Sequence, residues 1–199
     1  MNLPNKLTIL RVILIPFFMF FILAPDFTPM SKVMCDIIAA VIFGIASFTD
    51  FLDGYIARKN NIVTNFGKFM DPIADKLMVF GAFLCFLVSP SFSALYRYIF
   101  AVTVFVVLLR EFAVTSVRLV AGSSGGKVIA ANMAGKVKTV LQIIFILLAL
   151  LERHIFFFSD FMSEYVPLTC LSCIIMLIFT VISGVGYLVP NLEYLDPNK

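Results

Sequence analysis

The chain has 199 residues, of which 61% are hydrophobic and only 14% are charged, and its mean hydropathy is +1.04. Soluble domains are about half apolar and a quarter charged. This composition therefore indicates a polytopic membrane protein, with residues 1–199 forming a single membrane domain. The formal net charge of +3 is too small to indicate nucleic-acid binding.

Six apolar segments are each close to the length of about 20 helical residues that crosses a bilayer. The first is predicted to begin with Asn5 as its N-cap and to end at Pro25. A cleaved signal peptide is the alternative interpretation of this segment. The sequence predicts an all-α protein with six transmembrane helices, at about 7–24, 32–57, 71–88, 95–120, 134–151 and 167–189.

Basic residues gather on one side of this arrangement. Six spans place both termini and the loops after the second and fourth spans on the same side, which carries most of the lysines and arginines. The opposite side has only Lys32, Arg97 and Arg153. Because cytoplasmic loops are enriched in Lys and Arg, we expect both termini and the polar stretch described next to face the cytoplasm.

Four aspartates, Asp50, Asp53, Asp71 and Asp75, lie around the junction of the second and third segments. Charge beside lipid is costly, so such a cluster indicates a functional site. Four convergent carboxylates need cations, and ligands that are all oxygen favour hard ions such as Mg²⁺, Mn²⁺ or Ca²⁺. Two divalent cations would neutralise the four charges and could clamp the oxygens of a phosphoryl transfer.

The spacing of this stretch places its polar and small residues on helix faces. Positions i, i+3, i+4, i+7 and i+8 form one stripe of a helix, occupied by Asp50, Asp53, Gly54, Ala57 and Arg58. The small residues leave room for a ligand, and a guanidinium suits phosphate oxygens.

A second stripe is predicted on the helix that follows, and it contains Gly67, Asp71 and Asp75. Pro72 fits this helix only if the helix begins close to it, because proline has no N–H to donate. A short connection makes the two helices antiparallel neighbours, so the two stripes can converge.

The complete pattern, D-x2-D-G-x2-A-R-x8-G-x3-D-x3-D from Asp50 to Asp75, resembles the signature of the CDP-alcohol phosphatidyltransferase family. The resemblance implies a six-helix homodimer whose active site opens to the cytoplasm. It implies that the four aspartates bind two divalent cations, Mg²⁺ or Mn²⁺. It also implies that Asp75 takes the proton of an acceptor hydroxyl, which attacks the β-phosphorus of a CDP-activated lipid and releases CMP.

The same resemblance implies which residues hold the CDP-lipid, and these are Asn5, Thr8, Gly54, Ala57, Arg58, Thr64 and Gly67. Simple helix capping is the alternative role of Asn5 and Thr8.

A second basic set, Arg110, Arg118, Lys136 and Lys138, lies in the fourth and fifth predicted helices. Arg110 and Arg118 are eight residues apart and share a helix face. Four cations near the carboxylates need an anionic partner, and a phosphorylated acceptor fits; attraction to anionic lipid is the alternative. Glu111 could pair with one of these cations and orient it.

Two segments, Asn2–Arg11 and Leu109–Arg118, are similar to the bacterial subfamily that forms phosphatidylglycerophosphate. This similarity implies CDP-diacylglycerol as donor, sn-glycerol 3-phosphate as acceptor and a multi-pass location in the bacterial inner or plasma membrane. Another acceptor, such as an inositol phosphate, serine or phosphatidylglycerol, is the first alternative. A cation-coupled transporter is a more distant one.

Two further motifs are rejected. The segment Ala121–Lys127 lacks the first glycine and the final Ser or Thr of a phosphate-binding loop. Cys170 and Cys173 have no second Cys or His pair to complete a zinc site, so we expect the cysteines to serve in helix packing.

Overall fold

The computed structural model describes residues 2–60, 64–123 and 133–191, and the described part contains no strand. The all-α prediction is confirmed. A short 3₁₀ helix (Ala24–Asp26) follows the first helix, and a short helix α6 (Asp160–Tyr165) was not predicted. The six long helices are α1 (Leu3–Leu23), α2 (Lys32–Lys59), α3 (Asn65–Val88), α4 (Ala94–Ser123), α5 (Met133–Ile155) and α7 (Pro167–Leu188).

Two predicted helix starts are wrong. The N-cap of α1 is Asn2 rather than Asn5, because Pro4 is tolerated in the first helical turn. Helix α3 begins at Asn65, where the Thr64 hydroxyl accepts a hydrogen bond from the Gly67 backbone N–H at 3.0 Å. Pro72 therefore lies inside α3, which loses one helical hydrogen bond there.

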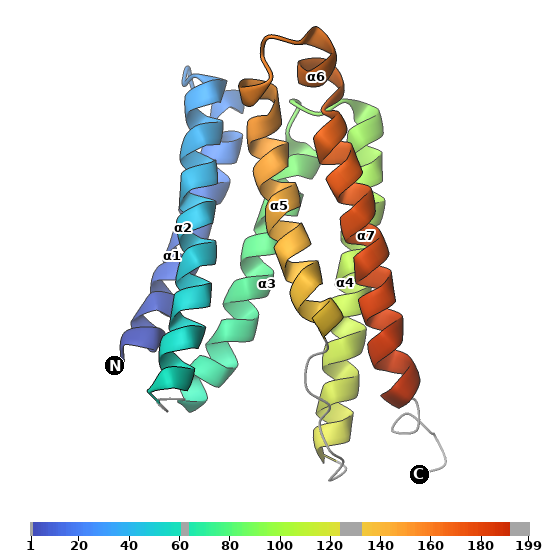
Figure 1. The fold of residues 1–199 in the computed structure, drawn as a ribbon. Helices are drawn as coiled ribbons and strands as arrows, with labels where there is room; N and C mark the ends of the chain where they lie inside the picture. The colour runs from blue at the N-terminus through green and yellow to red at the C-terminus, as the bar shows by residue number, and fades with distance from the viewer. Residues whose placement is uncertain (1, 61–63, 124–132, 192–199) are drawn as a thin grey trace.

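The long helices run side by side as a bundle of two groups (Figure 1). Helix α1 packs on α2 and α3, and α7 packs on α4 and α5. Contacts between α2 and α5 and between α3 and α4 join the groups. Helix α1 begins, α2 ends, α3 begins and α7 ends at one end of the bundle, whereas α6 lies at the opposite end (Figure 1).

Aromatic rings from α3, α4 and α5 form the centre of the core. Phe83, Phe86, Phe100 and Phe145 are almost fully buried, and Phe145 lies with its ring centroid 5.5 Å from those of Phe83 and Phe100. The four cysteines are free, and Cys35, Cys85 and Cys173 are buried, in agreement with the predicted packing role.

Helix α7 is attached to α5 by a fully buried carboxylate. Glu152 accepts hydrogen bonds from the backbone N–H groups of Leu168 and Thr169, at 2.8 and 2.6 Å, and from the Thr169 hydroxyl. These amides belong to the first turn of α7 and have no partner within the helix. Both oxygens of Glu152 are thereby occupied.

Four helical segments are long and apolar enough to cross a membrane, namely Leu3–Asp26, Lys32–Ile56, Ala94–Ala121 and Ser163–Asn191. Many large apolar side chains on these segments point outward; Phe105, for example, is 64% exposed. These features support a membrane protein. Within the described residues, α3 and α5 are not among these four segments, and α3 carries three charged residues, Asp71, Asp75 and Lys76.

Candidate active site

Two side chains of α1 gather three of the four predicted aspartates. The fully buried Arg11 forms ion pairs of 2.5 Å with Asp50 Oδ1 and with Asp53 Oδ2, both on α2. The Thr8 hydroxyl donates to Asp71 Oδ1 on α3 at 2.8 Å and lies 3.4 Å from Asp53 Oδ2. Helix α1 therefore contributes two side chains to the site.

The ion pairs of Arg11 were not predicted, because no spacing in the sequence links this residue to Asp50 or Asp53. Its position inside an apolar helix was the available signal, since an arginine in such a setting needs a carboxylate or another acceptor. Asp53 is 4% exposed, whereas the Asp50 side chain is 40% exposed, so the ion pairs run from the protein interior toward the surface.

The carboxylates supply a suitable set of donors for hard cations. Among the described residues, no three Asp, Glu, His or Cys side chains are grouped closely enough to surround a metal ion. The reason is local: Arg11 lies between Asp50 and Asp53, and Asp71 is engaged by Thr8. Oxygen donors from two neighbouring helices, already gathered around a positive charge, nevertheless fit Mg²⁺ or Mn²⁺.

The residues predicted to hold the CDP-lipid meet partly beside this cluster. Thr64 donates to Asn5 Oδ1 at 2.9 Å, which joins the start of α3 to α1. A Cβ at Gly67 would lie 3.4 Å from Asn5 Oδ1 and 3.6 Å from Asp71 Oδ2, so glycine leaves space next to the carboxylates. Gly54 follows Asp53 in α2.

The remaining two predicted positions, Ala57 and Arg58, also belong to α2, but their side chains lie outside the described part of the structure.

Asp75 lies one helical turn beyond Asp71 and borders a second feature, a cavity of about 580 Å³ between α3, α4, α5 and α7. Asp75 is within electrostatic reach of Asp50 and Arg11 on one side and of Lys138 and Glu111 on the other. Within the described residues it forms no hydrogen bond or ion pair. All four predicted acceptor residues line this cavity, and they are Arg110, Arg118, Lys136 and Lys138.

Glu111 pairs with two of these cations, where the sequence led us to expect a pair with one. Its Oε1 lies 2.9 Å from Arg110 Nη1 and also pairs with Lys138 Nζ. On α3, Lys76 donates to the Thr115 hydroxyl at 2.9 Å. Since the only acids among the described lining residues are Asp75 and Glu111, against five Lys and Arg, the cavity is positive and suits a small phosphorylated molecule.

Helix α7 contributes residues that were not predicted. Ser183 accepts a hydrogen bond from Arg110 Nη2 at 2.6 Å, and the Arg118 guanidinium lies 5.6 Å from the ring centre of Tyr187. A Cβ at Gly184 would approach Arg110 Cγ to 2.9 Å, so glycine makes room for this arginine. Two adjacent small residues, Ser183 and Gly184, were the available signal of a close approach.

Comparison with known proteins gives a consistent result over the whole chain. A family model described as CDP-alcohol phosphatidyltransferase matches residues 1–185. A CDP-diacylglycerol–glycerol-3-phosphate 3-phosphatidyltransferase of Bacillus subtilis is 44% identical over 204 aligned residues, covering 100% of this chain and 99% of that protein.

Proteins with the same name from other bacteria are also similar. The protein of Escherichia coli K12 is 37% identical over 145 residues, covering 72% of this chain and 73% of that protein. The protein of Rickettsia bellii is 42% identical over 119 residues, covering 59% and 58%.

Replacement of Arg11 tests its part in the fold. In Arg11→Gln, Asp53 stays buried without its cation, so we expect the free energy of unfolding to fall by about 3–5 kcal/mol. The corresponding fall in Tm is about 10 °C, measured in detergent with chelator present. Lys6→Gln, which alters an exposed cation of the same helix, is the control. Equal Tm values for the two variants would contradict the prediction.

Proposed function

The chain belongs to the CDP-alcohol phosphatidyltransferase family, and we propose that it transfers the phosphatidyl group of CDP-diacylglycerol to sn-glycerol 3-phosphate, forming phosphatidylglycerophosphate and CMP. The observation that carries this proposal is the position of Asp75, which joins the carboxylate cluster to the positive cavity. The similarity to bacterial enzymes named for this reaction supports the choice of substrates.

Asp50, Asp53, Asp71 and Asp75 would hold two divalent cations, Mg²⁺ or Mn²⁺. Bound there, the cations would neutralise the carboxylates and polarise the diphosphate of the donor. Asp50, whose side chain is 40% exposed, and Asp75, which has no partner within the described residues, leave carboxylate oxygens open to such cations.

The acceptor phosphate would bind to Arg110, Arg118, Lys136 and Lys138. Guanidinium and ammonium groups form charge-assisted hydrogen bonds with phosphate oxygens. Glu111 and Ser183 hold Arg110 in place, so its fork is oriented before the acceptor arrives. An acceptor bound by its phosphate in this cavity has its hydroxyl free to point toward Asp75.

Asp75 would take the proton from that hydroxyl. The hydroxyl oxygen then forms a bond to the β-phosphorus of the donor, and the bond from this phosphorus to the bridging oxygen breaks, so that CMP leaves. Because no described residue occupies the Asp75 carboxylate, it is available to accept a proton.

The donor would lie along α2 and the start of α3. Gly54, Ala57 and Gly67 would leave room for the cytidine diphosphate, and Arg58 would bind its phosphate oxygens. The contact between Asn5 and Thr64 supports a role for both at this place, with Thr8 next to them.

We further propose that all six long helices cross the membrane, with both termini and the active site on the cytoplasmic side, and that the protein is a homodimer. The common end of the bundle where α1 begins and α7 ends supports the placing of the termini (Figure 1). The proposed membrane is the bacterial plasma or inner membrane, where a lipid donor and a soluble acceptor can both reach the site.

An acceptor panel tests the function. We expect the purified protein to release CMP from CDP-diacylglycerol when sn-glycerol 3-phosphate is added, and to release much less with inositol phosphate, serine or phosphatidylglycerol. Because the carboxylates need cations, a chelator should abolish release and Mg²⁺ or Mn²⁺ should restore it. Release with none of these acceptors would contradict the proposal.

Asp75→Asn tests the proton acceptor. This change keeps the shape of the side chain but removes its basicity, so we expect CMP release to fall by at least about 100-fold while the protein still inserts and folds. Asp26→Asn, at the opposite end of the bundle, is the control. A near-normal rate for Asp75→Asn would exclude this residue as the base.

Gly184→Ala tests the acceptor cavity. The added methyl group would collide with Arg110 Cγ and displace this side chain, so we expect the KM for sn-glycerol 3-phosphate to rise about tenfold or more, with little change in the KM for CDP-diacylglycerol. Gly186→Ala adds the same group where no atom lies within 4 Å. Equal kinetics for the two variants would show that Arg110 does not bind the acceptor.

A further inference from the structure

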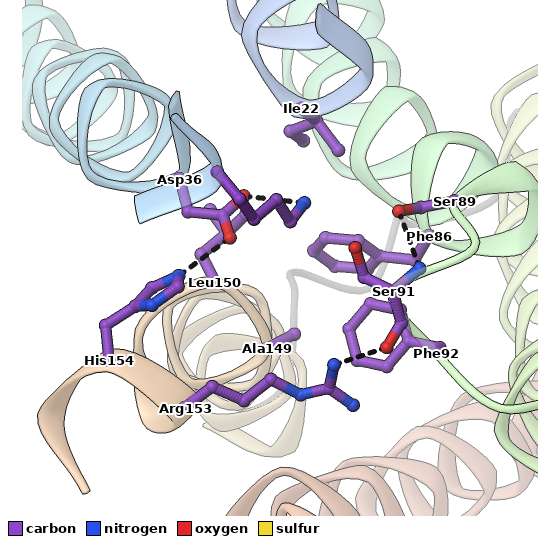
Figure 2. Close-up of a pocket in the computed structure, with 11 residues that line it drawn as sticks. Ile22, Asp36, Phe86, Ser89, Ser91, Phe92, Ala149, Leu150, Arg153 and His154 are labelled. Carbon is purple, nitrogen blue, oxygen red and sulfur yellow. Dashed lines mark hydrogen bonds and ion pairs between the residues drawn. The ribbon is translucent and has the colours of Figure 1, made fainter. Parts of the chain in front are cut away.

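A small cavity lies at the end of the bundle remote from the aspartates. Figure 2 shows it between the last turn of α1, the start of α2, the connection from α3 to α4 and the last turns of α5. Its volume is about 70 Å³, enough for a small group or a few water molecules. The proposed phosphatidyl transfer uses none of its residues.

Basic side chains outnumber acidic ones in the lining of this cavity. Asp36 pairs through Oδ1 with Lys32 Nζ at 2.9 Å and through Oδ2 with His154 Nε2 at 2.8 Å. Asp36 is the only carboxylate among the described lining residues, whereas Lys32, Arg153 and His154 are basic. Glu152, the chain neighbour of Arg153, is already occupied by the first turn of α7.

Arg153 is the least neutralised of these cations. Its Nη1 donates to the Ser91 carbonyl, and its guanidinium lies 5.2 Å from the ring centre of Phe92 (Figure 2). No described carboxylate forms an ion pair with it, and its buried Nε has no hydrogen-bond partner. A positive charge held partly out of water needs an anion to compensate the lost hydration.

A phosphate group meets these requirements. It carries negative charge and several acceptor oxygens, with which guanidinium and ammonium groups form strong hydrogen bonds. The small volume admits one such group and little more.

The surroundings favour a phosphate that belongs to a lipid. Apolar side chains, among them Ile22 and Phe86, form the wall of the cavity toward the bundle. The aromatic rings of Phe157, Phe158 and Phe161, which follow α5 at the same end, are 77%, 74% and 62% exposed. Exposed Phe rings favour contact with the apolar part of a bilayer, as on the apolar face of helices at a membrane surface.

We propose that this cavity binds the phosphate group of a phospholipid in the leaflet opposite the active site, with Lys32 and Arg153 as its ligands and His154 beside them. The acyl chains of the lipid then extend into the bilayer beside the bundle. The site is separate from the substrate sites and does not depend on the activity proposed above.

Lipid binding to matched variants tests the proposal. The full chain, purified in a neutral detergent without phosphate, is titrated with dihexanoyl phosphatidylglycerol. Binding is followed by the rise in Tm and by native mass spectrometry. We expect Lys32→Gln with Arg153→Gln to weaken the binding at least about tenfold, because two charge-assisted contacts are lost. Arg97→Gln removes a cation at the same end outside the cavity and should bind as the unmodified chain does.

Two more variants show whether weaker lipid binding results from the lost charge or from a loss of folding. Lys32→Gln alone changes a side chain that is 33% exposed and should still weaken binding, whereas Lys32→Arg keeps the charge and should restore it. CMP release by each variant reports whether the active site is intact. Lipid that binds elsewhere on the protein, including the active site, raises the Tm of all variants alike, so it does not affect the difference between them.

Three results would overturn the proposal. The first is equal lipid binding by the double variant and the Arg97→Gln control. The second is a rise in Tm with inorganic phosphate that matches the rise with the lipid at the same concentration, since this would assign the cavity to free phosphate. The third is the absence of any effect of either compound on the unmodified chain.

Discussion

The ion pairs of Arg11 are the contacts on which the active-site end depends. A guanidinium completely removed from solvent is stable in an apolar helix only if carboxylates surround it, and Asp50 and Asp53 do so from α2. Asp53, which is 4% exposed, is in turn costly to bury without a cation. Arg11 and Asp53 therefore compensate the cost of burying each other's charge. The position of α1 against α2 is fixed by these ion pairs as well as by packing.

The two groups of helices around these ion pairs supply side chains of opposite charge. Helices α2 and α3 supply the carboxylates, and α1 holds three of them through Arg11 and Thr8. Helices α4 and α5 supply most of the cations of the large cavity, and α7 contacts Arg110 and Arg118. Asp75 on α3 is the point at which the two halves meet. Such a division suits a reaction that joins a lipid-bound donor to a soluble acceptor, because each substrate can enter from its own side.

Much of this arrangement could be predicted because it repeats at helical spacing. The two aspartate stripes, on α2 and on α3, and the pair Arg110 and Arg118 follow the period of a helix, so the face on which each lies could be predicted. Contacts between distant segments could not be predicted in this way. Neither the pairing of Arg11 with α2 nor the support of Arg110 by Ser183 has a local signal that specifies its partner. The start of α3 was missed because the cap at Thr64 outweighs the discouragement of helix by Pro72.

Pro72 has a mechanical consequence for the carboxylates on either side of it. It lies directly after Asp71 and less than a turn before Asp75. Because its nitrogen holds no hydrogen, the turn carrying Asp71 and the turn before it share one bond fewer than elsewhere in α3. The lost bond would run from position 72 to the carbonyl of residue 68, whereas the turn from Asp71 to Asp75 keeps its own bonds. Asp71 and Asp75 therefore keep a fixed separation, and the start of α3, with Thr64 and Gly67, can tilt relative to them.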